Sequence, residues 1–216
     1  MKLILRIIPL FVLVLAAAAS ASADGISLKF DNGGSYIWGG YYVGPYNFTE
    51  TSNGQSQSLQ LICDDFQDEV FSGEPAWAVN TSTFPSLSNV EHQGSTLQYQ
   101  EIAWLVGKMT AIIQNGTATN ETVGDIQWAI WDIFDNGVSS EYLSAYDQNI
   151  ITGLLNQAAS NYGNGNYTIY TPKSDPPGYG TPQEYFGITP VPEPGTLMLL
   201  GMGLCGLVVF RRLFSH

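Results

Sequence analysis

Apolar and polar residues follow two different patterns along the middle of the chain. The first half holds short β-type runs broken by glycine, asparagine and proline, which predict strands at 26–30, 36–43, 58–63 and 76–81. Beyond them, apolar residues recur at three- and four-residue intervals, which predicts helices at 97–114, 122–135 and 141–160. A short strand at 167–170 follows. The pattern predicts an α+β fold: N-terminal strands in a sheet or partial barrel, then a three-helix segment.

The predicted third helix has a recognisable start and an apolar face. Ser139 or Ser140 precedes it as a capping residue, and the helix is expected to end near Gly163. Its apolar face is formed by Leu143, Tyr146, Ile150 and Leu154. The proline- and glycine-containing stretch 173–190 reads as a linker. One domain is therefore expected at 24–172, long enough to bury a core.

The N-terminus has the pattern of a secretion signal. Lys2 and Arg6 form a basic start, the apolar run 7–19 follows, and Ala21-Ser22-Ala23 supplies small residues before a cut. We expect signal peptidase to remove residues 1–23. The alternative is a permanent membrane helix, for which the run is short, since a span needs roughly 20 apolar residues.

The C-terminus carries a second apolar run. Residues 197–210 are apolar, and Arg211 and Arg212 follow them directly, which favours retention of this end in the cytoplasm as a stop-transfer signal. A C-terminal membrane helix is therefore expected. The segment before it contains Pro192-Glu193-Pro194, in which the prolines favour an extended backbone.

This order of Pro-Glu-Pro, apolar run, arginines and chain end resembles the PEP-CTERM sorting signal of Gram-negative bacteria that make exopolysaccharide. The resemblance covers residues 191–216. It implies that an exosortase recognises Pro192, Glu193 and Pro194 and cleaves near them. The protein is then expected to be anchored in the inner membrane facing the periplasm before processing, and to reach the cell surface or extracellular matrix afterwards.

Charge narrows the set of partners. Residues 24–190 contain three lysines and 18 acidic residues, a net charge of −15. Nucleic acid is excluded as a partner because phosphate contact needs a basic surface, and an anionic membrane surface is disfavoured for the same reason. The charge instead favours solubility of an exported protein.

Two residues in the domain need an explanation. Cys63 is its only cysteine, since Cys205 lies in the apolar C-terminal run, and a lone exported cysteine has no intramolecular disulfide partner. Gln127 falls inside the apolar stripe of the predicted helix 122–135, opposite Asp125, Asp132 and Asp135. A buried primary amide is costly unless its hydrogen bonds are made.

The residues around both positions resemble bacterial thioester domains of surface adhesins. Ile126-Gln127-Trp128-Ala129-Ile130-Trp131 fits the glutamine motif, and Leu61-Ile62-Cys63-Asp64-Asp65-Phe66 is similar to the cysteine segment. The resemblance implies that Cys63 and Gln127 condense into an internal thioester, which a surface amine or hydroxyl opens to give a covalent link. Trp104, Trp128 and Trp131 are expected to shield the bond from water.

Three other interpretations of these residues stay open. Cys63 is inert and buried in a non-covalent structural or glycan-associated matrix protein, or it works with His92 as a cysteine hydrolase or transferase. Asp64, Asp65, Asp68 and Glu69 form a solvated acidic edge or a calcium site, although the spacing of a known calcium motif is absent. The favoured interpretation is a non-enzymatic surface protein with no cofactor and no metal.

Overall fold

The computed structural model describes residues 25–163 and 167–187. Within these residues, none of the helices combines the length and apolar character that a membrane crossing requires. The expected signal peptide 1–23, the sorting motif Pro192-Glu193-Pro194, the span 197–210 and the stop-transfer residues Arg211 and Arg212 lie outside the described residues.

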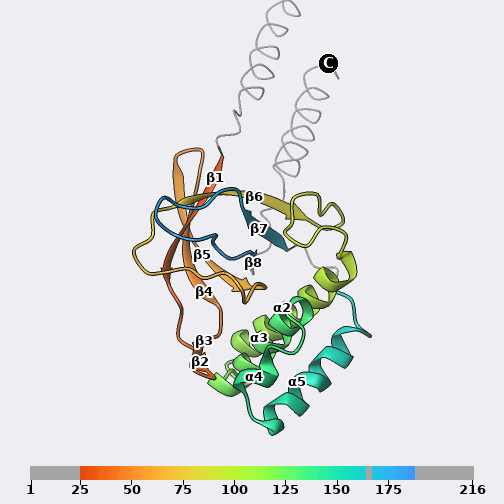
Figure 1. Ribbon diagram of the computed structural model, residues 1–216. Helices are drawn as coiled ribbons and strands as arrows, with labels where there is room; N and C mark the ends of the chain where they lie inside the picture. Colours follow the sequence, from red (N-terminus) through yellow and green to blue (C-terminus); the bar gives the residue numbers. More distant parts are fainter. Residues whose placement is uncertain (1–24, 164–166, 188–216) are drawn as a thin grey trace, which may run out of the picture.

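Six antiparallel strands close into a barrel in the order β1-β4-β5-β8-β7-β6, and β6 pairs back to β1. Figure 1 shows the barrel in orange, yellow and blue, so that strands from both ends of the domain meet in it. The strands are β1 (Ile26–Asn32), β4 (Tyr46–Ser52), β5 (Gln55–Cys63), β6 (Trp77–Thr83), β7 (Thr168–Pro172) and β8 (Tyr185–Gly187).

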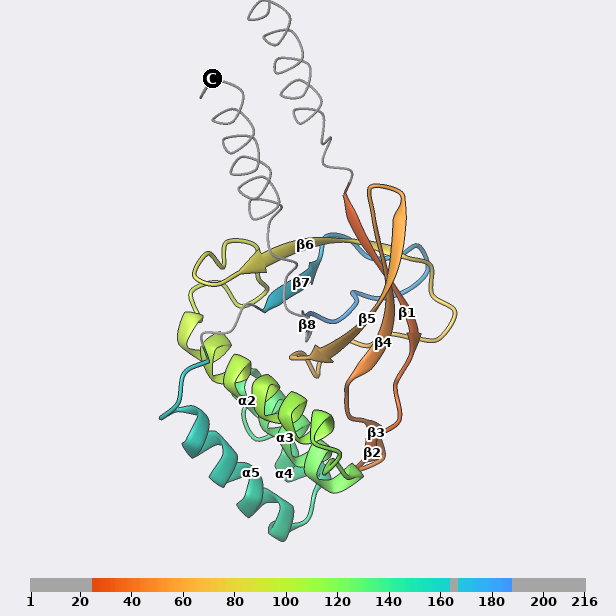
Figure 2. The same ribbon diagram turned by 180° about the vertical axis from the view of Figure 1, so that it is seen from behind.

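All the described helices are inserted between β6 and β7. They lie together on one side of the barrel (Figure 2), and α3 packs against both α2 and α5. Their bounds are α2 (Thr96–Gln114), α3 (Asn120–Phe134), α4 (Ser139–Tyr142) and α5 (Ala145–Ala158). α3 starts in a capping box: the Thr119 hydroxyl accepts from the Thr122 N–H, and the Thr122 hydroxyl accepts from the Thr119 N–H.

A small hairpin between β1 and β4 packs on α3. Strands β2 (Ile37–Trp38) and β3 (Tyr41–Tyr42) pair with each other outside the barrel. Trp38 packs directly on Gly124 of α3, where a Cβ atom would lie only 2.4 Å from the tryptophan side chain. This close approach brings the chain between β3 and β4 next to the buried face of α3.

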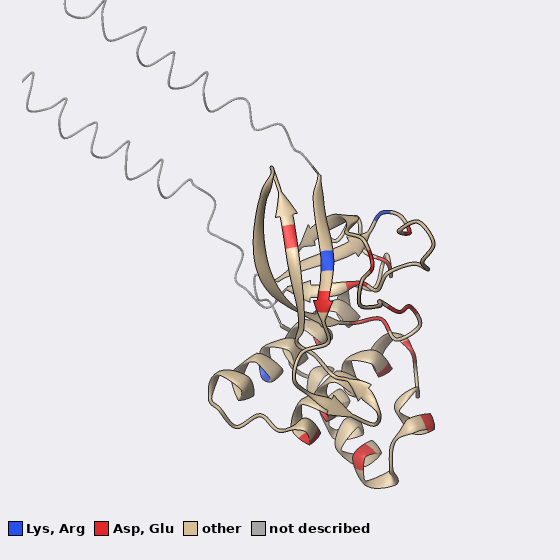
Figure 3. Ribbon diagram, turned by 90° about the vertical axis from the view of Figure 1, so that its left-hand side faces the viewer, with Lys and Arg blue, Asp and Glu red and all other residues tan. Residues whose placement is uncertain are grey.

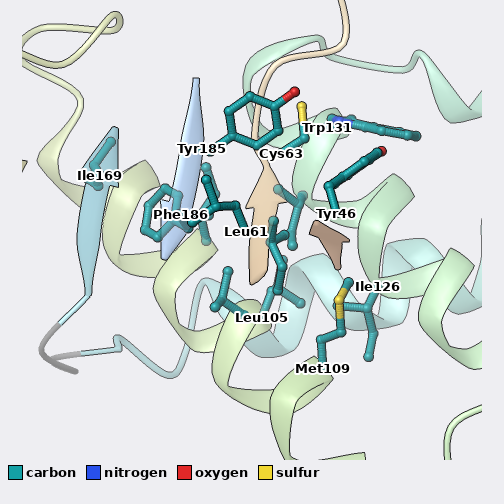
Figure 4. Packing of buried hydrophobic residues seen from close by; sticks show 14 of the residues in the cluster. Tyr46, Leu61, Cys63, Leu105, Met109, Ile126, Trp131, Ile169, Tyr185 and Phe186 are labelled. Carbon is teal, nitrogen blue, oxygen red and sulfur yellow. The ribbon is translucent and has the colours of Figure 1, made fainter. Parts of the chain in front are cut away.

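The core is continuous between barrel and helices. In β5 the side chains of Leu59, Leu61 and Cys63 are buried and Ser58 and Gln60 are exposed, as expected for a strand with one face on the core. At the end of the strand Ile62 on the other face is buried as well. The buried set continues into α2 and α3 through Leu105, Met109 and Ile126 (Figure 4). The end of β5 therefore points its last side chain into the junction of the two layers.

The structure corrects several expected elements. The sheet or partial barrel is a closed barrel, and 36–43 is the β2–β3 hairpin rather than one strand. Strand β4 was not expected, although the two-residue turn Asn53-Gly54, with φ of 51° and 71°, is a strong hairpin signal. Strand β8 lies inside 173–190, the segment expected to be a linker, and pairs with β5 and β7.

The expected three-helix segment contains four helices. The third predicted helix is interrupted after α4, where Leu143 and Ser144 are extended and Ser144 caps α5 by accepting from the Asp147 N–H. The interruption rotates the buried face, so that Asp147, Ile151, Leu154 and Ala158 are buried and Tyr146 is 67% exposed.

Candidate functional site

Cys63 ends strand β5 and is completely buried. It pairs with Tyr185 of β8, so the strand that closes the barrel also lies next to the thiol. Its Sγ donates to the Asp65 carbonyl oxygen at 2.8 Å and accepts from the Asp65 N–H at 3.4 Å. The chain thus turns around the sulfur as it leaves the strand. Figure 4 shows the sulfur between the rings of Tyr185 and Trp131.

Gln127 reaches the same point from α3. Its side chain is 0% exposed, which confirms the burial expected from the helical stripe. The Nε2 atom donates to the backbone carbonyl oxygen of Cys63 at 2.6 Å. The Oε1 atom is buried and has no hydrogen-bond partner. The fold therefore brings together two residues 64 positions apart, and it leaves half of the amide unsatisfied.

Gly44 makes room for the amide. It lies between the β2–β3 hairpin and β4, with φ of 26°. A Cβ atom at this position would approach Gln127 Oε1 to 2.9 Å, within van der Waals overlap. The glutamine carbonyl therefore occupies space that only glycine leaves open. Gly44 was not predicted as a site residue, because Gln127, which it contacts, is distant in sequence.

An aromatic cluster covers the site on its outer side. Trp128 and Trp131 of α3 are buried and lie 4.9 Å apart between ring centroids. Phe66 contacts both rings, at 5.4 and 5.1 Å. Tyr41 and Tyr142 complete the cluster against Trp128, each with a centroid separation of 5.5 Å. Phe66, Tyr41 and Tyr142 were not among the expected shielding residues.

Trp104, also expected as a shield, lies elsewhere. It is half-buried on α2, and the Lys108 ammonium lies 5.3 Å from its ring centroid. It forms none of the ring pairs of the aromatic cluster in the part of the chain that the structure describes. The apolar spacing of the predicted helix does not indicate whether Trp104 faces the Cys63 site.

The surroundings of Cys63 favour the neutral thiol. Burial raises the pKa of Cys63 well above its ordinary value, and the charges of Asp65 and Asp64 raise it further. The Asp65 backbone N–H, which donates to the sulfur, opposes this rise. Burial also raises the pKa of Tyr46 and of Tyr185, with a further contribution from Cys63. A thiol in such surroundings is a weak free nucleophile.

His92 does not contact the thiol. Its ring stacks on Phe134 with a centroid distance of 3.8 Å, and its backbone N–H donates to the Tyr99 hydroxyl. The hydrogen bonds described for Cys63 Sγ are with Asp65 alone. The arrangement gives the Cys–His hydrolase interpretation no base at hydrogen-bonding distance.

The acidic residues after Cys63 are not the solvated edge that the sequence favoured. Asp64 and Asp65 are buried, whereas Asp68 is half-buried and Glu69 exposed. Asp125, on the side of α3 opposite the apolar stripe, is also buried, and Asp147 of α5 lies close enough for its charge to act on Asp125.

Comparison with known proteins finds a matching sequence motif and a similar solved structure. Residues 190–212 match the PEP-CTERM protein-sorting motif. No curated protein matches the chain. A similar solved structure is the N-terminal thioester domain of a surface protein from Clostridium perfringens, at 13% identity and a TM-score of 0.52. The match covers 77% of this chain and 99% of that chain.

The chain carries a PEP-CTERM sorting motif and a domain with the thioester-domain fold. The sorting motif implies processing by an exosortase, a membrane-associated sorting enzyme. At 13% identity the structural match describes the fold of the domain, and its chemistry has to be argued from Cys63 and Gln127 themselves.

Proposed function

We propose that this protein is exported to the cell surface, where an internal thioester between Cys63 and Gln127 links it covalently to a target. The observation that carries the proposal is the meeting of the Gln127 amide with Cys63, at 2.6 Å from its backbone carbonyl, in a buried site. The PEP-CTERM motif and the thioester-domain fold support it. The protein then acts once per molecule, as an adhesin or matrix cross-linker and not as an enzyme.

The bond-forming step conserves atoms without an added reactant. Cys63 Sγ attacks Gln127 Cδ, the Sγ–Cδ bond forms, and the Cδ–Nε2 bond breaks. Ammonia leaves and carries away the thiol proton. The raised pKa of Cys63 does not prevent this step, because the proton departs with the leaving group and no free thiolate has to accumulate.

In the linking step the sulfur is the leaving group. A target amine attacks Gln127 Cδ, the Cδ–Sγ bond breaks, and the amine proton passes to sulfur, which restores the Cys63 thiol. The product is an amide, which is more stable than the thioester. A hydroxyl would give an ester in the same way.

A cavity on the outer side of the aromatic cluster supplies the approach. Its volume is about 460 Å³, and it is lined by Tyr46, Phe66 and Trp131, which also border the Cys63 site. Asp68 and Glu69 lie on its wall. Acidic groups and aromatic faces attract an ammonium ion, so this entrance favours an amine over an anionic target.

Covalent capture of a labelled amine tests the proposal. We expect the full-length protein to incorporate a biotinylated primary amine and release a free thiol, with the label on Gln127 in peptide mapping. Cys63→Ala and Gln127→Ala abolish the incorporation, whereas the exposed Gln60→Ala retains it. Label that persists in Cys63→Ala, or that maps to another residue, would contradict the thioester.

A second candidate function is non-covalent binding of a matrix glycan, and a groove with several amide side chains along it favours this function. The groove has a volume of about 600 Å³ between β1, β4, β5 and the end of α2. Along it, Gln60 Nε2 donates to Asn47 Oδ1, and Asn47 Nδ2 donates to Asn32 Oδ1. Such rows of amides match sugar hydroxyls. This function predicts retention on exopolysaccharide that survives Cys63→Ala and weakens in Asn47→Ala.

A further inference from the structure

A group of three carboxylates lies beside the Cys63 site. Asp65 and Asp68 belong to the segment that follows β5, and Glu91 belongs to the segment that precedes α2. One carboxylate oxygen from each of the three lies within 4.8 Å of the other two. Oxygens that coordinate one ion at 2.3–2.6 Å are separated by no more than about 5 Å, so this spacing fits a single cation.

The buried member of the group has an oxygen with no partner. Asp65 is 4% exposed, and its Oδ1 accepts from the Gln67 N–H at 2.8 Å and from the Asp68 N–H at 3.3 Å. Its Oδ2 is buried and makes no hydrogen bond. A buried carboxylate oxygen without a donor is costly, and a bound cation removes this cost.

A second buried carboxylate, that of Asp64, also lacks hydrogen-bond partners. Asp64 is 1% exposed, and neither of its oxygens has a hydrogen-bond partner. Asp64 directly precedes Asp65, so two buried acidic residues follow β5 in succession. This residue is independent of the three that share the close spacing.

The nearby carboxylates that do have partners have a different role. Glu184 accepts from the Tyr99 hydroxyl at 2.5 Å and from the Glu91 N–H at 3.0 Å, and also from the Thr171 hydroxyl. Asp135 accepts from the Phe66 N–H and from Gln67 Nε2. These two residues tie loops to strands and helices, and their oxygens are already engaged.

No positive side chain offsets the group. The described residues contain Lys29, Lys108 and Lys173 and no arginine, and Figure 3 shows how strongly acidic positions outnumber basic ones. Charges of one sign gathered in a partly buried place require a counter-ion or a proton.

We propose that Asp65, Asp68 and Glu91 bind a calcium ion. The donor set is oxygen only, with no imidazole or thiolate, which selects a hard cation. Calcium accepts irregular geometry and water ligands, whereas magnesium requires a near-ideal octahedron. Glu91 is exposed, so water can complete the coordination. Sites of this kind in extracellular modules have dissociation constants of about 10⁻⁴ to 10⁻³ M.

The ion joins two segments that no strand pairing connects. One segment begins directly after Cys63 and carries Phe66 between Asp65 and Asp68, and Phe66 packs on Trp131 at 5.1 Å. The other segment leads into α2. Calcium therefore fixes the aromatic cluster over the site, whether or not Cys63 is acylated.

Calcium titration of the full-length protein, purified in detergent and stripped with a chelator, tests the site. We expect the unfolding temperature of the wild type to rise with calcium up to about 10 mM, since a ligand stabilises the state that binds it. Asp68→Asn and Glu91→Gln each weaken calcium binding at least tenfold. Glu69→Gln, the exposed neighbour outside the group, behaves as wild type.

Any of three results would overturn the assignment of calcium to this group. The first is a wild-type protein whose unfolding temperature and calorimetric titration show no response to calcium. The second is an Asp68→Asn/Glu91→Gln double variant that binds calcium as the wild type does. A larger response to magnesium than to calcium at equal concentration would reject calcium as the ion. Because Asp68 is half-buried and Glu91 exposed, the double variant is expected to fold.

Discussion

At the scale of single residues, the hydrogen bonds of the Gln127 amide are only half made. Its nitrogen is hydrogen bonded to Cys63, whereas its oxygen is buried without a donor. An unsatisfied buried oxygen of this kind costs about 1–3 kcal/mol. Loss of the nitrogen as ammonia would leave a thioester carbonyl, a weaker acceptor that suffers less from the missing donor. The residue is therefore better suited to the acylated state than to the free amide.

Gly44 gives the first prediction at this scale. Gly44→Ala places a methyl group about 2.9 Å from Gln127 Oε1 on a backbone with φ of 26°. We expect the free energy of unfolding to fall by about 1–3 kcal/mol, and the fraction of protein carrying the thioester to fall with it, because the carbonyl is displaced. Chemical denaturation and intact mass measure the two effects.

Gly54→Ala is the matched control for Gly44. It also has a positive φ, 71°, but a Cβ atom there would meet nothing within 4 Å. We expect it to lose a similar amount of stability from backbone strain while keeping the full fraction of thioester. If Gly44→Ala kept that fraction as well, the contact with Gln127 would have no chemical consequence.

At the scale of elements, α3 is unusual because it is buried on every side along its middle. Every residue from Val123 to Trp131 is buried, since α2, α5 and the β2–β3 hairpin surround it. Asp125 is one of these buried residues. Burial raises its pKa from an ordinary 3.8 to about 6, with further contributions from Asp147 and Glu121. An ionised Asp125 at neutral pH therefore destabilises the fold.

Asp125→Asn gives the prediction at the element scale. A carboxyl whose pKa is raised on folding stabilises the protein fully below its unfolded pKa, and this stabilisation is lost as pH rises through about 6. We expect the variant to match the wild type near pH 4. At pH 7 it should exceed it by up to about 2 kcal/mol, because one pKa unit is worth about 1.4 kcal/mol and solvent screens part of it.

Urea unfolding at several pH values measures the effect of Asp125→Asn. Asp175→Asn removes an exposed carboxyl and serves as the control for the loss of one negative charge. A variant that stayed equal to the wild type from pH 4 to pH 7 would show that Asp125 does not titrate differently in the folded state.

Some of the helices and strands could be predicted from the sequence, and others could not. Helices α2 and α3 were predicted within two residues because their apolar spacing is regular and long. Strand β8 was missed, since three residues carry no alternation and their pairing with Leu61, Ile62 and Cys63 is remote in sequence. The break between α4 and α5 depends on the cap at Ser144, which the apolar spacing alone does not reveal.

At the scale of the whole molecule, the barrel depends on its last strand. β8 pairs with β5 on one side and β7 on the other, and its Tyr185 and Phe186 are fully buried. Without it, two strand edges are unpaired and the wall beside Cys63 is missing. The folded unit therefore has to extend at least to Gly187, beyond the expected domain limit at residue 172.

Truncation provides the prediction at this scale. A chain of residues 24–187 is expected to unfold cooperatively on heating, followed by circular dichroism. A chain of residues 24–172 is expected to lack a cooperative transition, because open strand edges and lost core aromatics prevent closure. A shorter chain that unfolded as sharply as the longer one would show that β8 is dispensable.

The candidate site could be predicted in part. Cys63 and Gln127 were recognised as a pair from their motifs, and Trp128 and Trp131 followed from the same helix. Gly44, Phe66 and Tyr142 could not be predicted, since only the folded chain brings them beside α3. The burial of Asp64 and Asp65 was also not foreseen, because runs of acidic residues are normally exposed.

Intact mass of the mature protein from its native host tests the central claim most directly. The thioester predicts a mass lower than that of the processed sequence by one ammonia molecule. Treatment with methylamine is expected to raise this lower mass by one methylamine molecule. Cys63→Ala should show the full mass of its own sequence. A wild-type protein of full mass, with a thiol that reacts with an alkylating reagent once unfolded, would contradict the account.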